Sequence, residues 1–187
     1  MKTKDLAYIA LFAAITAVLG LGPAVSVGPV PITAQTLGVM LAGSILGARR
    51  GFLSQLLFLV LVAIGLPILP GGGGGLAVFA GATAGYLFSW PVGAFVIGLL
   101  TERFWTRYNL AWGIVANVVG GIVVVYAIGV PVLVAVTGLP WRDALWLGAA
   151  VFIPGDLLKA VIAAAIAVQV RRSYPVIERP RHTLAVR

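Results

Sequence analysis

The chain has 187 residues, of which 61% are hydrophobic and only 10% are charged. With a mean hydropathy of +1.09, it has too few polar side chains to cover a water-soluble domain of this size. The formal net charge of +8 could indicate nucleic-acid binding in a soluble protein, but here the basic residues lie between apolar runs and in the tails, as membrane topology predicts, so nucleic acid is not an expected partner.

Hydropathy predicts six membrane-spanning helices, because each span needs about 20 apolar residues. In chain order we expect them at residues 5–21, 33–46, 52–69, 76–100, 110–136 and 144–170. The first is interpreted as a retained helix and not a cleaved secretion signal, since Asp5 interrupts its basic end. The second is short enough for a steeply placed or partly re-entrant helix. The predicted fold class is therefore an all-α membrane protein, with a transmembrane domain at residues 1–172 and a short basic tail at residues 173–187.

Lysine and arginine predict the orientation of these spans. If the N-terminus is cytoplasmic, Arg142 alone falls outside, Lys159 lies within the membrane, and the other eleven of the 13 basic residues are inside: Lys2, Lys4, Arg49, Arg50, Arg103, Arg107, Arg171, Arg172, Arg179, Arg181 and Arg187. Both termini are thus expected in the cytoplasm of a multi-pass protein of the cell membrane. The outer connections at 22–32 and 70–75 are nearly uncharged and rich in glycine and proline. A ligand site that opens outward is therefore favoured.

Two opposite charges lie within the last predicted span, in the stretch VFIPGDLLKAVIAA. Asp156 and Lys159 are three residues apart, so on a helix they share a face and can meet. An isolated charge at this depth costs about 2.5–3.5 kcal/mol, which favours a polar ligand site over a pair that only joins helices. Pro154 lacks an N–H and can break the helix just before the pair, so that a positive helix end points into the site.

The other spans offer few further candidates for ligand contact. Polar side chains occur at Gln35, Asn117, Thr33, Thr83 and Tyr86, although any one of them alone is more often a bond between helices. The run PGGGGG, which includes Gly74, is either a slack linker or a loop whose bare backbone approaches a ligand. The five tryptophans, at positions 90, 105, 112, 141 and 146, are interpreted as an interfacial belt.

Small residues recur at helical spacing in the first span. Ala10 and Ala14 form one pair, and Ala13 and Ala17 form another. Such spacing lets a second helix approach closely, so these alanines predict either an internal packing face or a surface for a partner.

Enzymatic chemistry and metal binding are not expected. The chain has no cysteine, its single histidine is His182 in the tail, and carboxylates are too sparse for a paired acid–base site. The glycine run lacks the lysine and hydroxyl residue of a phosphate loop, so no cofactor is predicted and any use of ATP must come from other chains.

Three stretches carry a resemblance to a known family: VPITAQTLGVMLAG, GGGGGLAVFAGATAGYL and FIPGDLLKA. In these stretches, and in length, span count and motif order, the chain resembles BioY, the biotin-specific S component of energy-coupling factor (ECF) transporters. The second stretch departs from the usual family form GPTGGYL, with Ala82 in place of proline and Ala84 in place of glycine.

The resemblance implies a six-helix S-component bundle that captures biotin on the outer side and delivers it to the cytoplasm. It implies partners as well: a transmembrane coupling subunit, which contacts small residues of the first helix, and two ATP-binding subunits. By motif position, Asp156 and Lys159 are the first ligand candidates, followed by Gln35 and Tyr86, then Thr33 and the glycine loop. The alternatives are an S component for another vitamin, an ion-coupled small-molecule carrier, and a membrane scaffold without transport.

Overall fold

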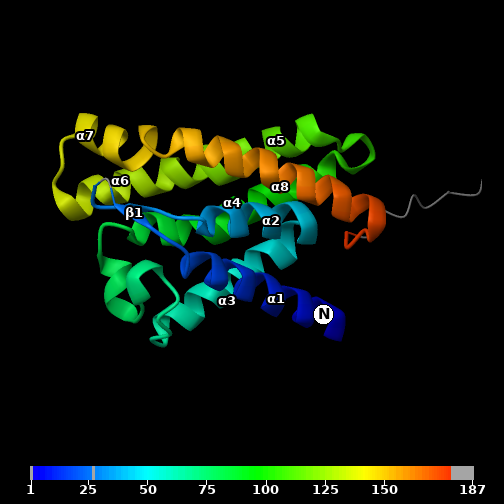
Figure 1. The fold of residues 1–187 in the computed structure, drawn as a ribbon, viewed down its shortest axis with the longest axis horizontal. Helices are drawn as coiled ribbons and strands as arrows, with labels where there is room; N and C mark the ends of the chain where they lie inside the picture. The colour runs from blue at the N-terminus through cyan, green and yellow to red at the C-terminus, as the bar shows by residue number, and fades with distance from the viewer. Residues whose placement is uncertain (1, 27, 178–187) are drawn as a thin grey trace, which may run out of the picture.

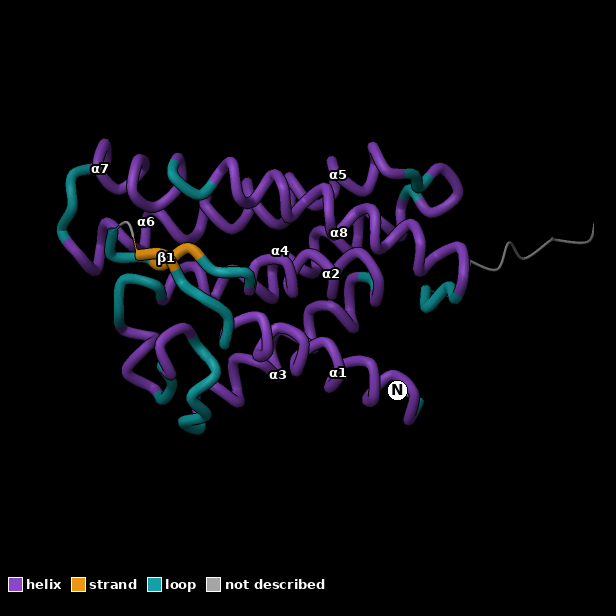
Figure 2. Tube along the Cα trace, viewed as in Figure 1, coloured by secondary structure: helices purple, strands orange, loops and turns teal. Residues whose placement is uncertain are grey.

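The structure is a computed structural model that describes residues 2–26 and 28–177. These residues form a helical bundle with one small hairpin of two-residue strands (Figures 1 and 2). The elements are α1 (Thr3–Gly20), β1 (Val25–Ser26), β2 (Pro31–Ile32), α2 (Gln35–Leu46), α3 (Ala48–Ala63), η1 (Pro70–Gly72), η2 (Leu76–Ala80), α4 (Ala84–Arg103), η3 (Trp105–Arg107), α5 (Leu110–Val118), η4 (Val119–Val124), α6 (Val125–Thr137), α7 (Trp141–Leu145), η5 (Trp146–Ala150) and α8 (Ile153–Ser173). The prediction of an all-α membrane fold is confirmed in its helical character.

Within the described residues, four helical stretches are long and apolar enough to cross a membrane: Thr3–Gly20, Ala84–Arg103, Leu110–Thr137 and Trp141–Ser173. The last two each contain a π-helical segment, η4 and η5, between α-helical parts. The second predicted span corresponds to α2, a shorter apolar helix of 12 residues, and the third to α3, with 16 residues. A helix of 12 residues rises only about 18 Å, which is less than the hydrocarbon core of a bilayer.

The predicted boundaries of the third and fourth spans are wrong. The third helix ends at Ala63 and not at residue 69, because Gly65 takes a left-handed φ of 101° and Pro67 has no N–H to continue the helix. The fourth begins at Ala84 and not at residue 76. Leu76–Ala80 is apolar like a span but forms a separate 3₁₀ turn, so the connection from α3 to α4 is much longer than the sequence suggests.

The turn between α2 and α3 consists of a single residue, Gly47. Its φ of 85° is a conformation that favours glycine. At the first turn of α3, the Ala48 N–H donates to Oε1 of Glu102 on α4 over 2.8 Å. This carboxylate satisfies one of the N–H groups that a helix start leaves without a partner.

Both ends of the chain's helical part lie at the same end of the bundle. In Figure 1 the N-terminus and the end of α8 lie on the right, while the β1–β2 hairpin and α7 lie at the opposite end. Helix α8 ends at Ser173, where the tail is predicted to begin. Of the predicted tail, residues 178–187, with Arg179, Arg181, His182 and Arg187, lie outside the described residues.

Candidate ligand-binding site

The last long stretch is interrupted just before the Asp–Lys pair. The π-helical segment η5 ends at Ala150, a turn follows, and α8 begins at Ile153 with a proline in its first turn. Since Pro154 has no N–H, it cannot donate to the carbonyl four residues before it. Val151 and Phe152 nevertheless keep right-handed helical backbone angles, so the predicted break is present only as an irregular hydrogen-bond pattern, and Asp156 lies in the first turn of α8.

Asp156 and Lys159 meet as an ion pair. Lys159 Nζ lies 2.8 Å from Asp156 Oδ1, and the two side chains are 15% and 3% exposed. The pair is thus almost sealed within the bundle, as the sequence predicted from the three-residue spacing. A buried pair of this kind needs additional hydrogen bonds to offset the cost of removing it from water.

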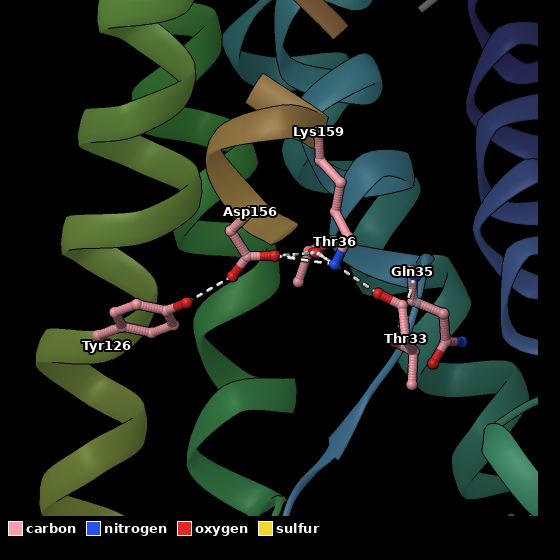
Figure 3. Close-up of polar contacts among 6 residues, drawn as sticks. All are labelled: Thr33, Gln35, Thr36, Tyr126, Asp156 and Lys159. Carbon is pink, nitrogen blue, oxygen red and sulfur yellow. Dashed lines mark hydrogen bonds and ion pairs between the residues drawn. The ribbon is translucent and has the colours of Figure 1, made fainter. Parts of the chain in front are cut away.

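Groups from α2, from the segment just before it and from α6 supply those bonds (Figure 3). Lys159 Nζ also donates to the Thr33 carbonyl over 2.5 Å and to Thr36 Oγ1 over 3.0 Å. The Thr36 hydroxyl donates to Asp156 Oδ1 over 3.1 Å, and the Tyr126 hydroxyl on α6 donates to Asp156 Oδ2 over 2.5 Å. All three donors of Lys159 and both oxygens of Asp156 are therefore occupied by protein groups. We call these five residues the ionic cluster.

A cavity of 190 Å³ lies next to the ionic cluster. It is lined by four predicted site residues, Thr33, Gln35, Thr83 and Tyr86, together with Val30, Pro31, Leu69, Pro70, Gly73, Val78, Leu87 and Trp90. Asp156 and Lys159 do not line it. Thr33 connects the cavity to the ionic cluster, since Thr33 lines the cavity and its carbonyl accepts from Lys159. Pockets for small ligands usually measure about 300–1,000 Å³, so this cavity is smaller than a usual ligand pocket.

Tyr86 presents its ring to the cavity and anchors its hydroxyl elsewhere. The hydroxyl donates to the Gly148 carbonyl over 2.7 Å, and Gly148 belongs to η5. A Cβ at Gly129 would lie 2.5 Å from the Tyr86 ring, so the ring needs a glycine beside it. The wider π-helical turn of η5 and the two glycines thus position one apolar wall of the cavity.

Gln35 is buried, and in Figure 3 its side chain extends away from Asp156. Its Nε2 donates to the carbonyls of Thr16 and Ile68, over 3.4 and 3.2 Å. These bonds tie α1 and the connection after α3 to the start of α2. The amide oxygen Oε1 accepts no hydrogen bond from any described residue and remains an acceptor beside the cavity.

Two other predicted ligand residues lie away from the cavity. Asn117 is fully buried, accepts from the Ser44 hydroxyl over 2.9 Å and donates to the Ala160 carbonyl over 3.3 Å, so it joins α5 to α2 and α8. Gly74 packs on the backbone of Leu66, where a Cβ would come within 3.0 Å of the carbonyl carbon. Its neighbour Gly73 lines the cavity instead.

Three residues of this region were not singled out as ligand candidates by the sequence. Thr36 and Tyr126 complete the ionic cluster. A tyrosine within an otherwise apolar span indicates that its hydroxyl has a hydrogen-bond partner nearby. Trp90 was interpreted as part of an interfacial belt, which is wrong: it is 6% exposed, packs near Phe58 and lines the cavity. Among the described side chains its indole N–H is one of the few buried groups without a partner.

The four alanines of α1 divide between two faces. Ala10 and Ala14 are exposed, whereas Ala13 is fully buried in the core and Ala17 packs partly buried against it. Residues 2–26 and 28–177 contain no cluster of His, Asp or Glu suited to a metal ion.

Comparison with known proteins identifies a family. The model of the BioY family matches residues 1–176. The chain belongs to the BioY family. It is 51% identical over 184 residues to the biotin transporter BioY of Rhizobium etli, which covers 95% of this chain and 98% of that one. It is 49% identical over 174 residues to the biotin transporter BioY of Rhodobacter capsulatus, covering 88% and 91% of the two chains.

A solved structure agrees with the fold. The crystal structure at 2.1 Å of the S-component for biotin from an ECF-type ABC transporter matches with a TM-score of 0.86 and 34% identity, over 92% of this chain and 95% of that one. These BioY relatives are named as transporters and not as enzymes, in agreement with the sequence-based prediction.

Proposed function

We propose that this chain is the biotin-binding S component of an ECF transporter, which captures biotin on the outer side of the cell membrane and delivers it to the cytoplasm. The observation that carries this function is the buried Asp156–Lys159 pair, which is connected to the cavity through Thr33 in a chain of the BioY family. Charged side chains buried within membrane-spanning helices are expected to bind a polar ligand.

Biotin has the groups that the ionic cluster can bind. Its ureido ring offers two N–H donors and a carbonyl, its side chain ends in a carboxylate, and the rest is mostly apolar. Asp156 would accept the ureido N–H groups, and Lys159 would donate to the ureido oxygen or the carboxylate. Each such bond, with one charged partner, contributes about 1.5–3 kcal/mol. The Tyr86 ring and the apolar walls of the cavity would surround the fused rings.

Binding requires an exchange of partners, because the ionic cluster is already saturated. The Thr33 carbonyl is the group best placed to leave Lys159, since it belongs to the segment between the β1–β2 hairpin and α2. Its release would join the small cavity to the ionic cluster and give biotin room. The same segment and the connection after α3, which share the cavity wall, would then close over the vitamin as a lid.

The proposed topology has six membrane crossings and cytoplasmic termini. The four long stretches would cross fully, and α2 and α3 would complete the bundle together with the extended connections at their outer ends. The described lysines and arginines other than Arg142 and Lys159 lie at the starts of α1 and α3, at the ends of α4 and α8, and in η3. In Figure 1 the start of α1 and the end of α8 lie at the same end of the bundle. The positive-inside rule assigns that end to the cytoplasm.

Transport would need partner chains. A transmembrane coupling subunit and two ATP-binding subunits would supply the energy, because this chain has no phosphate-binding loop. The exposed Ala10 and Ala14 on α1 offer a smooth stripe on which a helix of the coupling subunit can pack.

Binding of biotin to the purified chain tests the proposal. Asp156→Asn and Lys159→Met are each expected to weaken binding at least about tenfold, from the loss of one charge-assisted bond. Asp143→Asn is the matched control, since this carboxylate lies on α7 at the outer end. Wild-type affinity in both test variants would remove the pair from the site. Mass spectrometry of the small molecule that copurifies with the chain separates biotin from another vitamin, and uptake driven by an ion gradient without an ATPase would favour a carrier.

A further inference from the structure

A second hollow lies on the outside of the bundle, between α3 and α4. It has a volume of 470 Å³ and is lined by Arg49, Phe52, Leu53, Val92 and Phe95. On α3 the lining residues are spaced three and four apart, and on α4 they are spaced three apart, so each helix contributes one continuous stripe. Phe52 and Phe95 meet edge to face at 6.4 Å. Apart from Arg49, the lining side chains are apolar. We call this hollow the α3–α4 groove.

Among the described residues, none neutralises the single charge of the α3–α4 groove. Arg49 is exposed and makes no hydrogen bond or ion pair with any described residue. Of the described carboxylates on neighbouring elements, Glu102 accepts from the Ala48 N–H, and Asp5 pairs with Arg50 over 3.2 Å. An arginine at the end of an apolar groove therefore offers an open, planar donor for an anion.

The surrounding charge favours an anionic ligand. At the end of the bundle where α1 begins and α8 ends, the described residues include Asp5 and Glu102 as carboxylates against a larger set of cations: Lys2, Lys4, Arg49, Arg50, Arg103, Arg107, Arg171 and Arg172. In the proposed topology this end lies at the headgroup level of the inner leaflet, where anionic lipids are attracted to basic residues.

We propose that the α3–α4 groove is a binding site for one anionic phospholipid of the inner leaflet. An acyl chain would lie along Phe52, Leu53, Val92 and Phe95, and Arg49 would bind the phosphate by two parallel hydrogen bonds. The site rests on the proposed membrane topology but not on biotin as the substrate, because the groove shares no lining residue with the cavity. It gives the α3–α4 surface a function separate from vitamin capture.

Native mass spectrometry can count the lipids retained after the chain is extracted from nanodiscs of equal phosphatidylglycerol and phosphatidylcholine. The wild-type chain is expected to retain one phosphatidylglycerol. Arg49→Gln should lower its retention about tenfold, as expected for one charge-assisted contact. Arg107→Gln is the matched control, since it removes the same charge from η3, outside the groove. Val92→Phe fills the groove without changing charge and should also release the lipid.

Each outcome decides the proposal. Equal retention of both lipids, or loss in Arg107→Gln as large as in Arg49→Gln, would overturn it. Stabilisation of the chain by inorganic phosphate alone, dependent on Arg49 but without selective lipid retention, would indicate a plain anion site and would also overturn it. Biotin binding should remain at the wild-type level in Arg49→Gln and Val92→Phe, so failure of the lipid site is distinguishable from failure of the proposed function.

Discussion

Breaking the buried ion pair from one side should cost more stability than removing it altogether. Replacement of Lys159 by methionine leaves the Asp156 carboxylate, 3% exposed, without a counter-ion. Removing one member of a buried pair typically costs about 3–5 kcal/mol. Here we expect about 3 kcal/mol, because the hydroxyls of Thr36 and Tyr126 still donate to the carboxylate.

The double variant Asp156→Asn with Lys159→Met tests the coupling between the two charges. It leaves no unpaired charge, so its loss of stability should be smaller than that of Lys159→Met alone, even though it removes more polar groups. Biotin binding should nevertheless stay lost, because neither charged partner is present. The pattern of restored stability without restored binding separates a ligand site from a pair that only joins helices.

The assay is thermal unfolding of the four chains, with and without biotin, in the same nanodiscs. At a biotin concentration close to the wild-type Kd, biotin should raise the midpoint of the wild-type chain and have little effect on the three variants, since a ligand stabilises the state that it binds in proportion to its affinity. Strictly additive losses in the two single variants would refute the coupling. A double variant that is still stabilised by biotin would refute the role of the pair in binding.

Three further changes give distinct results. Tyr126→Phe should weaken biotin binding about tenfold in calorimetry, because it removes a hydrogen bond that orients the Asp156 carboxylate. Gly148→Ala should lower the unfolding free energy by about 1–3 kcal/mol in a denaturation series, since the added Cβ would lie 2.5 Å from the Tyr86 hydroxyl oxygen. Cysteines introduced at Pro31 and Gly73, on opposite sides of the lid, should stop biotin exchange when crosslinked; unchanged uptake would exclude this lid.

The sequence predicted those parts of the molecule that depend on local pattern. The last span, the irregular hydrogen-bond pattern within it just before Pro154 and the meeting of Asp156 with Lys159 all follow from hydropathy, one proline and a spacing of three residues. The start of α4 did not follow, because Leu76–Ala80 is as apolar as a span and only its glycine-bounded 3₁₀ geometry sets it apart. Leu76–Ala80 and a membrane span have similar local composition, and only the backbone conformation distinguishes the short 3₁₀ turn from the start of a long helix.

The contacts that complete the site depend on tertiary packing. Tyr126 lies 30 residues from Asp156, and Thr36 lies 120 residues away, so no spacing rule connects them. The position of Trp90 illustrates the same limit: a tryptophan in a span has an ordinary explanation at the membrane surface, and only the packing with Phe58 places it in the cavity wall. Conversely, Asn117 has the chemistry of a ligand residue, but its side-chain amide is hydrogen-bonded to Ser44 on α2 and Ala160 on α8.

The one-residue corner at Gly47 leaves α2 and α3 without slack between them. A flexible loop would absorb a small shift of one helix, whereas a one-residue turn held by Glu102 couples the two helices rigidly. The far end of α2 begins beside Thr33 and Thr36, the very residues that must yield when a guest enters. Their displacement would therefore move α2 as a rigid unit and tilt α3 with it, so that in the proposed topology the inner end of the bundle would respond to ligand at the outer end.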